Sequence, residues 1–233
     1  MSRCVALSCA LGLGGGLLVA PMQAGAQEAT SGWRDDFTSR VEALALLQSL
    51  NAELLSHPSA TLTLERWCGA HHLAAEAKVV AERVHGVDKP LPEDARKQLD
   101  IGPDEPVRYR RVQLACGGHV LSEADNWYVP SRLTEAMNRE LDSSDTPFGK
   151  VVQPLHFRRQ TLSADLLWSP LPQGWESGAP LPAMPGAPMP MPRHVLEHRA
   201  VLYDQANRPF SLVVESYTSE VLSFVPAGPH PGP

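Results

Sequence analysis

The chain has 233 residues, with 26 acidic against 20 basic side chains and a formal net charge of −6. This length is enough for one domain with a substantial hydrophobic core. Because acidic residues outnumber basic ones and the lysines and arginines form no block, the composition argues against binding to nucleic acid.

Residues 1–26 have the pattern of a secretory signal peptide. Arg3 precedes an apolar, Gly-rich run over residues 5–20, and Ala24 and Ala26 fit the small residues of a signal-peptidase site. The run is too short and too rich in glycine for a membrane span, and no later stretch approaches the necessary length. We therefore expect a periplasmic or secreted mature chain without a membrane span, cleaved near Ala26. A wrongly assigned start codon is the alternative.

Two cysteines, Cys68 and Cys116, remain after this cleavage. In an oxidising compartment such a pair favours a disulfide, which would connect a helical region to a strand region. The alternative is two buried thiols that pack as small hydrophobic groups. The sequence leaves both possibilities open.

The first part of the mature chain has helical periodicity. Apolar residues recur at helical spacing over residues 33–56, and the turn sequence His57-Pro58-Ser59 ends this helix. Thr61 or Thr63 is expected to cap a second helix. The segment over residues 84–106 is polar and rich in turn-forming residues.

The middle of the chain changes to the two-residue period that is typical of a β-strand. Val112 and Leu114 fall on one face and Arg111 on the other. Gly117-Gly118 supplies a turn, and a return strand runs to Val129. We therefore expect a β-hairpin here.

A short amphipathic helix is predicted over residues 132–141, followed by a tight turn over 145–149. Residues 169–193 contain eight prolines and three methionines, which predicts an irregular or polyproline loop. A second hairpin is expected over residues 198–218, and the Pro/Gly-rich tail over 226–233 is expected to be disordered.

Arg111 and Glu215 each place a charged group among apolar neighbours, in the first and the second hairpin respectively. Such a charge is costly unless it is paired or used. A guanidinium and a carboxylate that face one pocket would suit a small anionic ligand with a hydroxyl or an ether. The alternatives are a structural ion pair, or two separate surface charges.

Two groups of residues have the types that bind metals. Cys68, His71 and His72 form a C-x-x-H-H pattern, and a set of soft ligands resembles that of exported copper proteins: Met184, Met189, Met191 and His194. The first group has no convincing fourth ligand nearby. The methionines fit equally well on the surface of a proline-rich loop. We therefore expect no metal and no cofactor.

Three short motifs, in order along the chain, resemble those of chorismate pyruvate-lyases. The first is R-x-V-x-L, then a glycine turn and a strand ending at Pro130, with Arg111 at the family's separation from that proline. The second is Pro147-Phe148-Gly149 followed by an apolar pair. The third is an arginine-led strand and a turn, then Pro209 and Glu215 in the pattern P-apolar-x-apolar-apolar-x-E.

The resemblance covers about residues 60–222. It implies an α+β fold with an antiparallel sheet of about six strands and helices on one side. The same fold forms the effector-binding UTRA domain of certain transcription regulators, and the second hairpin resembles that domain as much as the lyase.

The resemblance also implies roles for individual residues. Arg111 matches the arginine that holds a carboxylate of chorismate or of the product 4-hydroxybenzoate, and Glu215 matches the acidic residue near the product hydroxyl. Phe148 and Gly149 match the turn that covers the bound ring. The chemistry agrees, because arginine suits bidentate capture of a carboxylate and a carboxyl group in an apolar pocket can keep a proton to donate.

We therefore predict an exported, monomeric protein with a helical segment over residues 27–58 and a chorismate-lyase-like domain over 59–225. It is expected to bind a small aromatic or cyclic carboxylic acid. The enzymatic form of this hypothesis is a carbon-oxygen lyase that eliminates pyruvate from a chorismate-like substrate to give 4-hydroxybenzoate. The alternative is a non-catalytic envelope protein that uses the same fold, with the Pro/Met-rich loop as its contact surface.

Overall fold

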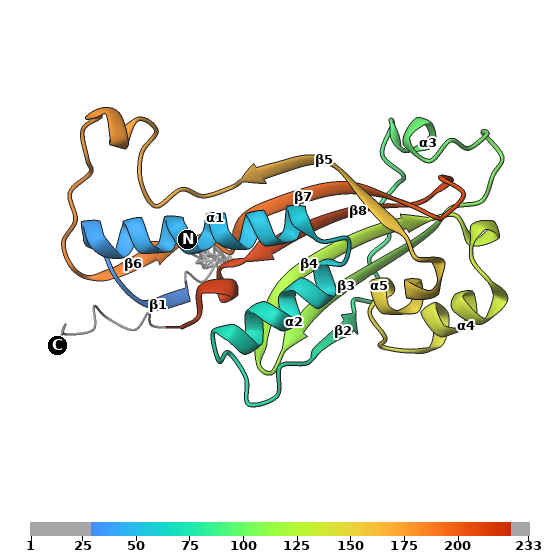
Figure 1. Ribbon diagram of the computed structural model, residues 1–233, viewed down its shortest axis with the longest axis horizontal. Coiled ribbons are helices and arrows are strands. Elements are labelled where there is room, and N and C mark those ends of the chain that lie inside the picture. Colours follow the sequence, from blue (N-terminus) through green and yellow to red (C-terminus); the bar gives the residue numbers. More distant parts are fainter. Residues whose placement is uncertain (1–28, 225–233) are drawn as a thin grey trace, which may run out of the picture.

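Six antiparallel strands form a sheet with the order β2-β3-β4-β8-β7-β5 (Figure 1). The computed structural model describes residues 29–224, so the predicted signal peptide and tail lie outside the described residues. The strands are β2 (Val79–Arg83), β3 (Arg108–Cys116), β4 (His119–Tyr128), β5 (Arg158–Leu166), β7 (His194–Tyr203) and β8 (Pro209–Thr218). This architecture confirms the predicted α+β class with a six-stranded antiparallel, chorismate-lyase-like sheet.

The two predicted hairpins form the centre of the sheet. β3 and β4 are joined at Gly117, whose φ of 59° is the left-handed conformation that glycine adopts without strain. β7 and β8 form the second hairpin, and pairing of β4 with β8 joins the two. The edge strands β2 and β5 were not predicted. In β5 exposed and half-buried residues alternate, so its sequence lacks the apolar alternation that identifies a strand.

Helices cover mainly one face of the sheet (Figure 1). They are α1 (Phe37–Ser56), α2 (Ala60–Ala70), α4 (Glu135–Ser143) and α5 (Phe148–Val151). The short α3 (Ala95–Gln98) packs on the opposite face, against Trp127 and Leu212. Four 3-10 turns complete the described chain: η1 (Pro130–Arg132), η2 (Gln153–Leu155), η3 (Trp175–Ser177) and η4 (Ser219–Leu222). No helix within residues 29–224 has the length and apolar character that a membrane span requires.

The start of α2 differs from the expectation. Ser59, and not Thr61 or Thr63, is the N-cap, and its hydroxyl accepts a hydrogen bond from the Leu62 amide at 3.3 Å. Both threonines lie inside the helix and are buried. Ser59 takes the capping position because the helix begins directly after it, where its hydroxyl reaches an amide of the first turn.

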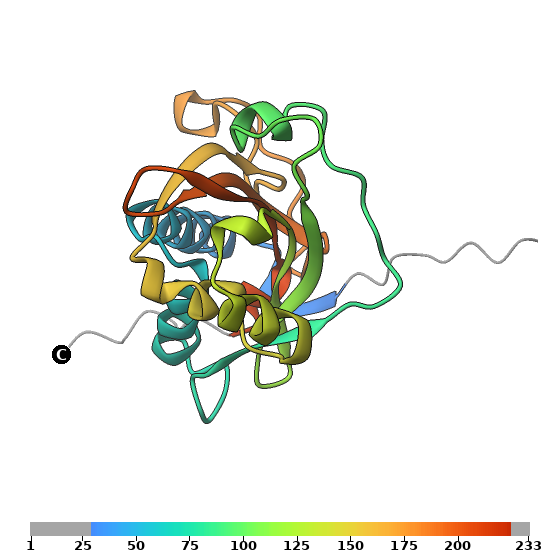
Figure 2. The same ribbon diagram turned by 90° about the vertical axis from the view of Figure 1, so that its right-hand side faces the viewer.

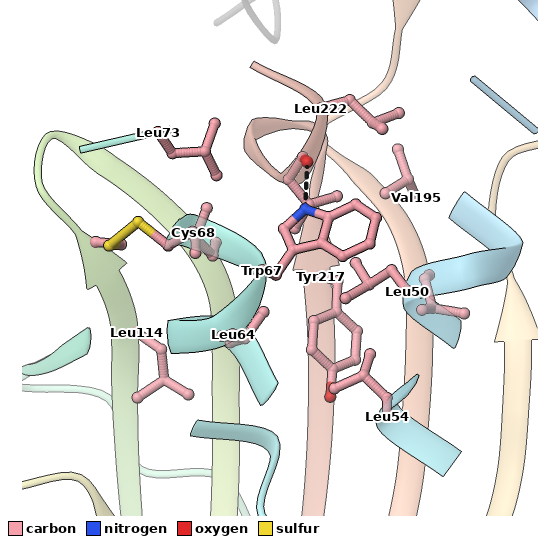
Figure 3. Packing of buried hydrophobic residues seen from close by; sticks show 14 of the residues in the cluster. Leu50, Leu54, Leu64, Trp67, Cys68, Leu73, Leu114, Val195, Tyr217 and Leu222 are labelled. Atoms are coloured by element: carbon pink, nitrogen blue, oxygen red, sulfur yellow. Dashed lines mark hydrogen bonds between the residues drawn. A yellow bond between two sulfur atoms is a disulfide. The ribbon is translucent and has the colours of Figure 1, made fainter. Parts of the chain in front are cut away.

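The larger core cluster lies between α1, α2 and the sheet (Figure 3). Trp67 of α2 packs beside Tyr217 of β8, and its indole Nε1 donates to the Val221 carbonyl at 2.8 Å. Leu50 and Leu54 approach from α1 on the other side. Their burial fixes both helices on the sheet by removing apolar surface from water.

The Pro/Met-rich segment is more ordered than its composition predicts. Within residues 169–193, the strand β6 (Pro188–Met191) pairs with β1 (Ala29–Arg34). The last two residues of β1 fall within the helix predicted over residues 33–56. Met189 and Met191 point inward and are 1% and 2% exposed. The prolines alternate with them on the outward side, where a missing backbone donor is tolerated. The expectation of an entirely irregular loop was therefore wrong for these four residues.

Cys68 and Cys116 form a disulfide that spans 48 residues and ties α2 to the end of β3 (Figure 3). The helix and the strand so connected both contribute walls to the cavity described below. Cross-linking distant residues stabilises a fold chiefly because it restricts the unfolded chain.

Replacing both cysteines in the variant Cys68→Ala/Cys116→Ala should lower the free energy of unfolding by about 3–4 kcal/mol, the loop-entropy value for this separation. Urea unfolding with and without a thiol reductant measures the effect. The double variant should not respond to the reductant, whereas the wild type should be destabilised by it. Equal stability of all four samples would contradict a stabilising disulfide.

Candidate functional site

A cavity lies between the helix-bearing face of the sheet and the segments that begin α2 and α5. The space inside it that the centre of a water molecule can occupy is about 50 Å³. Most of the wall is apolar, from the side chains of Val112, Leu114, Phe148, Phe157, Leu202 and Val213. Four polar side chains come from four different strands: Arg110, Asn126, Arg159 and Glu215.

Arg110 of β3 is 5% exposed and only partly satisfied. Its Nη2 donates to the carbonyl oxygens of Ser144 at 3.3 Å and Thr146 at 3.2 Å. Its Nε and Nη1 are buried without a partner among the described residues. Burial, and then the nearby positive charge of Arg83, lower the pKa of Arg110. Buried donors without an acceptor are costly, so these two nitrogens mark a place where an anion would be stabilised.

Arg159 of β5 and Glu215 of β8 form a buried ion pair. Arg159 Nη2 lies 2.6 Å from Glu215 Oε2, and the two side chains are only 6% and 8% exposed. The Tyr217 hydroxyl donates to the same oxygen at 3.2 Å. Burial works to lower the pKa of Arg159, but the Glu215 charge and Tyr217 outweigh it and the pKa is raised. Arg159 therefore stays charged, and its bond to Oε2 holds the Glu215 side chain in one position.

The charges around the cavity do not cancel. Two guanidinium groups, Arg110 and Arg159, face one carboxylate, Glu215, which leaves one positive charge in excess. Ser59, Ala60 and Thr61, at the start of the 11-residue helix α2, also line the cavity. The N-terminus of a helix carries partial positive charge and free amides. The site is therefore suited electrostatically to a single small anion.

His198 of β7 lies beside the Arg159–Glu215 ion pair, because it is the register partner of Glu215. Its Nε2 lies 2.8 Å from Asn51 Oδ1 of α1, and the residue is fully buried. Burial, and then the positive charge of Arg159, lower the pKa of His198 to about 4. His198 is therefore uncharged at neutral pH and adds no positive charge beside Arg159.

Arg111 does not lie in this cavity, so the expectation that Arg111 and Glu215 face one pocket was wrong. Its Nη1 donates to both carboxylate oxygens of Asp125, at 2.9 and 3.0 Å, and its Nη2 reaches Glu123 at 3.3 Å. Successive side chains of a strand point to opposite faces. Since Glu215 points toward the helices, a residue of the opposite parity on β3 cannot meet it.

The opposite face of the sheet carries its own network of paired charges. Burial works to raise the pKa of Glu123, but hydrogen bonds from Arg193 and His194 outweigh it and lower the pKa to about 2. Asp125 accepts from Lys89, from Arg111 and from the Tyr109 hydroxyl. Arg111 therefore belongs to a network of ion pairs that supplies acceptors for its guanidinium, which is the structural alternative considered above.

The sequence contained a signal for the correct arginine. The R-x-V-x-L pattern begins at Arg110 when it is matched to the sequence residue by residue. Its valine and its leucine are the cavity residues Val112 and Leu114. All three share one face because they are two residues apart. Arg159 had no comparable signal, since the strand that carries it was not predicted.

Phe148 and Gly149 both line the cavity, as does Glu215. The Phe148 ring packs 5.5 Å from Tyr128 and 6.4 Å from Phe210, which fixes it over one end of the cavity. A Cβ atom at Gly149 would lie 3.4 Å from Ser59 Oγ, so glycine allows α5 to approach the start of α2 closely. The roles of these residues toward a ligand stay predictions.

The candidate metal ligands are engaged elsewhere. Cys68 is in the disulfide, and the His71 ring lies 4.1 Å from Trp67 and 4.2 Å from Phe224. Met189 and Met191 are core residues. Among residues 29–224, no three His, Cys, Asp or Glu side chains are grouped closely enough to hold a metal ion.

No family model matches the chain. The uncharacterized protein y4mC of Sinorhizobium fredii is 54% identical over 207 residues, a stretch that covers 88% of this chain and 87% of that protein. The chain belongs to the y4mC family. Because the match extends over most of both proteins, it is not confined to one motif.

The similarity to solved structures is weak. PhnF of Mycobacterium smegmatis is 17% identical, with 72% of this chain and 67% of that chain covered and a TM-score of 0.47. The possible transcriptional regulator YydK of Bacillus subtilis is 20% identical, with 63% and 61% covered and a TM-score of 0.39. The chain thus spans less than two thirds of YydK. Similarities this distant give no basis for transferring a ligand to the y4mC family.

The lowered pKa of His198 predicts a pH-dependent stability. Between the ordinary histidine pKa of 6.5 and about 4, the unfolded chain binds a proton that the folded chain excludes. The free energy of unfolding should therefore fall as the pH drops through this window, by about 3 kcal/mol at its lower end.

Urea unfolding across this pH range measures the slope. His198→Gln, which keeps an amide for Asn51, should remove this part of the slope, whereas His85→Gln at an exposed position should not change it. An unchanged slope in His198→Gln would contradict the assignment.

Proposed function

We propose that the protein binds a small aromatic or cyclic monocarboxylic acid in the cavity. Arg110 would hold the carboxylate, and Glu215 would contact a hydroxyl or ether at the opposite end. The observation that carries this proposal is the pair of unpartnered, buried nitrogens on Arg110 beside a cavity with one positive charge in excess. Hydrogen bonds between a guanidinium and a carboxylate are among the stronger ones in proteins, and burial strengthens them.

The size of the cavity supports a ligand with a single ring. A volume of about 50 Å³ for water centres is well below the roughly 300–1,000 Å³ of most ligand sites, so it restricts the ligand to about one ring. The apolar wall suits the ring, and the polar groups at the two ends suit its substituents. Larger ligands would require Phe148 or its neighbours to move.

The arrangement at Glu215 supports a hydroxyl at the end away from Arg110. Among the described residues, Arg159 and Tyr217 both bond to Oε2, which leaves Oε1 for a ligand group. A 4-hydroxybenzoate ring places its carboxylate and hydroxyl at opposite ends, which suits Arg110 on β3 and Glu215 on β8, two strands separated by β4.

The enzymatic form of the proposal is elimination of pyruvate from a chorismate-like substrate to give 4-hydroxybenzoate. Forming the aromatic ring supplies the driving force, so the protein has only to orient the substrate and exchange one proton. Glu215 would be the catalytic residue. We also propose that the mature protein is periplasmic or secreted, because residues 1–26 resemble a signal peptide.

Arg110 and Arg111 offer a matched pair of variants on neighbouring residues that face opposite sides of the sheet. Arg110→Gln should abolish the rise in melting temperature caused by 4-hydroxybenzoate, whereas Arg111→Gln should keep it, because only Arg110 lines the cavity. Thermal-shift titration of residues 27–233 measures this. The melting temperatures without ligand control for folding. Equal responses of the two variants would contradict the site.

Glu215→Gln separates binding from turnover. Wild-type protein incubated with chorismate should release pyruvate, and the variant should lose about 100-fold or more of that rate, since a positioned acid or base contributes about this much. Its affinity for 4-hydroxybenzoate should change only a few-fold, because the amide keeps the hydrogen bond. Binding without pyruvate release by the wild type would favour a non-catalytic envelope binding protein. The absence of both 4-hydroxybenzoate binding and pyruvate release would overturn the proposal.

A further inference from the structure

A second and larger hollow lies beside the free edge of β3. β2 pairs only with residues 112–116, so residues 107–110 have no neighbouring strand on that side. The segment that connects β2 to α3 runs outside this edge (Figure 2), and the end of α4 borders it on the other side. Together they form an open groove of about 570 Å³ with a predominantly polar lining. Its volume falls in the range of binding sites for small molecules.

The groove has an excess of positive charge. Its lining includes four cationic side chains, Arg83, Lys89, Arg108 and Arg110, against two carboxylates, Asp88 and Asp142. Asp142 is shared, because its carboxylate accepts from Arg108 at 2.8 Å and its backbone carbonyl from Arg83 at 2.5 Å. Arg83 and Arg108 therefore both contact Asp142.

Lys89 does not contribute to this excess, because its ammonium group pairs with Asp125, on the opposite face of the sheet. The remaining excess is one charge, from three arginines against two carboxylates. Arg83 is close enough to Arg110 to act on it by like-charge repulsion, while Asp145 acts in the opposite sense. Binding an anion lowers the repulsion between like charges that are held together in a partly buried place.

Arg110 lines both hollows, and this connects them. Its Nη2 is fixed by the carbonyls of Ser144 and Thr146, so the guanidinium has a defined position between the cavity and the groove. The unpartnered nitrogens Nε and Nη1 are the donors that remain for an anion on either side.

We propose that the groove is a second anion site, which takes a small molecule with a multiply charged oxyanion group and opposes ligand binding in the cavity. The opposition rests on the proposed function of the cavity; the anion site itself does not. Two anions that share the Arg110 guanidinium compete for its donors and repel each other, so each weakens the other by the same factor.

The anion site is tested by titrating the mature chain with inorganic phosphate, and in a parallel arm with citrate, at constant ionic strength. Saturable stabilisation of the wild type is expected in at least one arm, and the preferred arm identifies the chemistry as phosphate or polycarboxylate. Arg83→Gln/Arg108→Gln should weaken this binding at least tenfold, while Arg199→Gln on β7, outside the groove, should leave it unchanged. Equal stabilisation of all three proteins, or none, would overturn the anion site.

The opposition is tested with 4-hydroxybenzoate as the cavity ligand. Saturating phosphate or citrate should raise its dissociation constant about three- to tenfold in the wild type. The dissociation constant should not change in Arg83→Gln/Arg108→Gln, whose cavity is intact. An affinity that is independent of the anion in the wild type would overturn the opposition. If 4-hydroxybenzoate binds none of the proteins, the proposed function fails, while the phosphate and citrate titrations still decide whether the groove is an anion site.

Discussion

The alternation of side chains along the central strands is the constraint on which the rest of the structure depends. Arg110 and Arg111 are neighbours in the chain, yet Arg110 lines a cavity with unpartnered donors and Arg111 joins an ion network that supplies its acceptors. Pairing of β3 with β4, and the disulfide at the end of β3, fix which arginine faces which side. A shift of one residue in this register would exchange their environments and turn Arg111 toward the cavity face in place of Arg110.

Charged groups on the two faces of the sheet are paired to different extents. On the face opposite the cavity, Glu123 and Asp125 each have several cationic or donor partners, so that network is satisfied internally. On the cavity face, Arg159 and Glu215 compensate each other, with Tyr217 as an additional donor. Among the described residues, Arg110 keeps two buried nitrogens without a partner, whereas Arg159 and His198 each keep one. A buried cation in a fixed position is preorganised for an anion, because little ordering remains to be done when the ligand arrives.

The cavity is closed by segments that are far apart in the sequence. The start of α2, the start of α5 and the strands β3, β5 and β8 all contribute walls. Short-range features bring them together: the Ser59 cap begins α2 beside the cavity, and Gly149 lets α5 approach that cap. His198 and Asn51 form a hydrogen bond between the sheet and α1. The same buried polar groups therefore contribute to the ligand site and to the stability of the fold.

The sequence by itself determined the α+β class, the two central hairpins, the long first helix and the presence of Phe148, Gly149 and Glu215 as candidate residues. The hairpins and the helix follow from periodicity and turn residues, which are local properties of the chain. The fold class and the candidate residues follow from the resemblance of the ordered motifs to chorismate pyruvate-lyases. The sequence did not determine β2 and β5, because edge strands have one exposed side and their polar residues hide the alternation. The arginine that meets Glu215 was also decided by tertiary structure. Arg110 reaches the cavity through the register of the sheet, and Arg159 reaches it through a strand recognisable only after β7 supplies its partner.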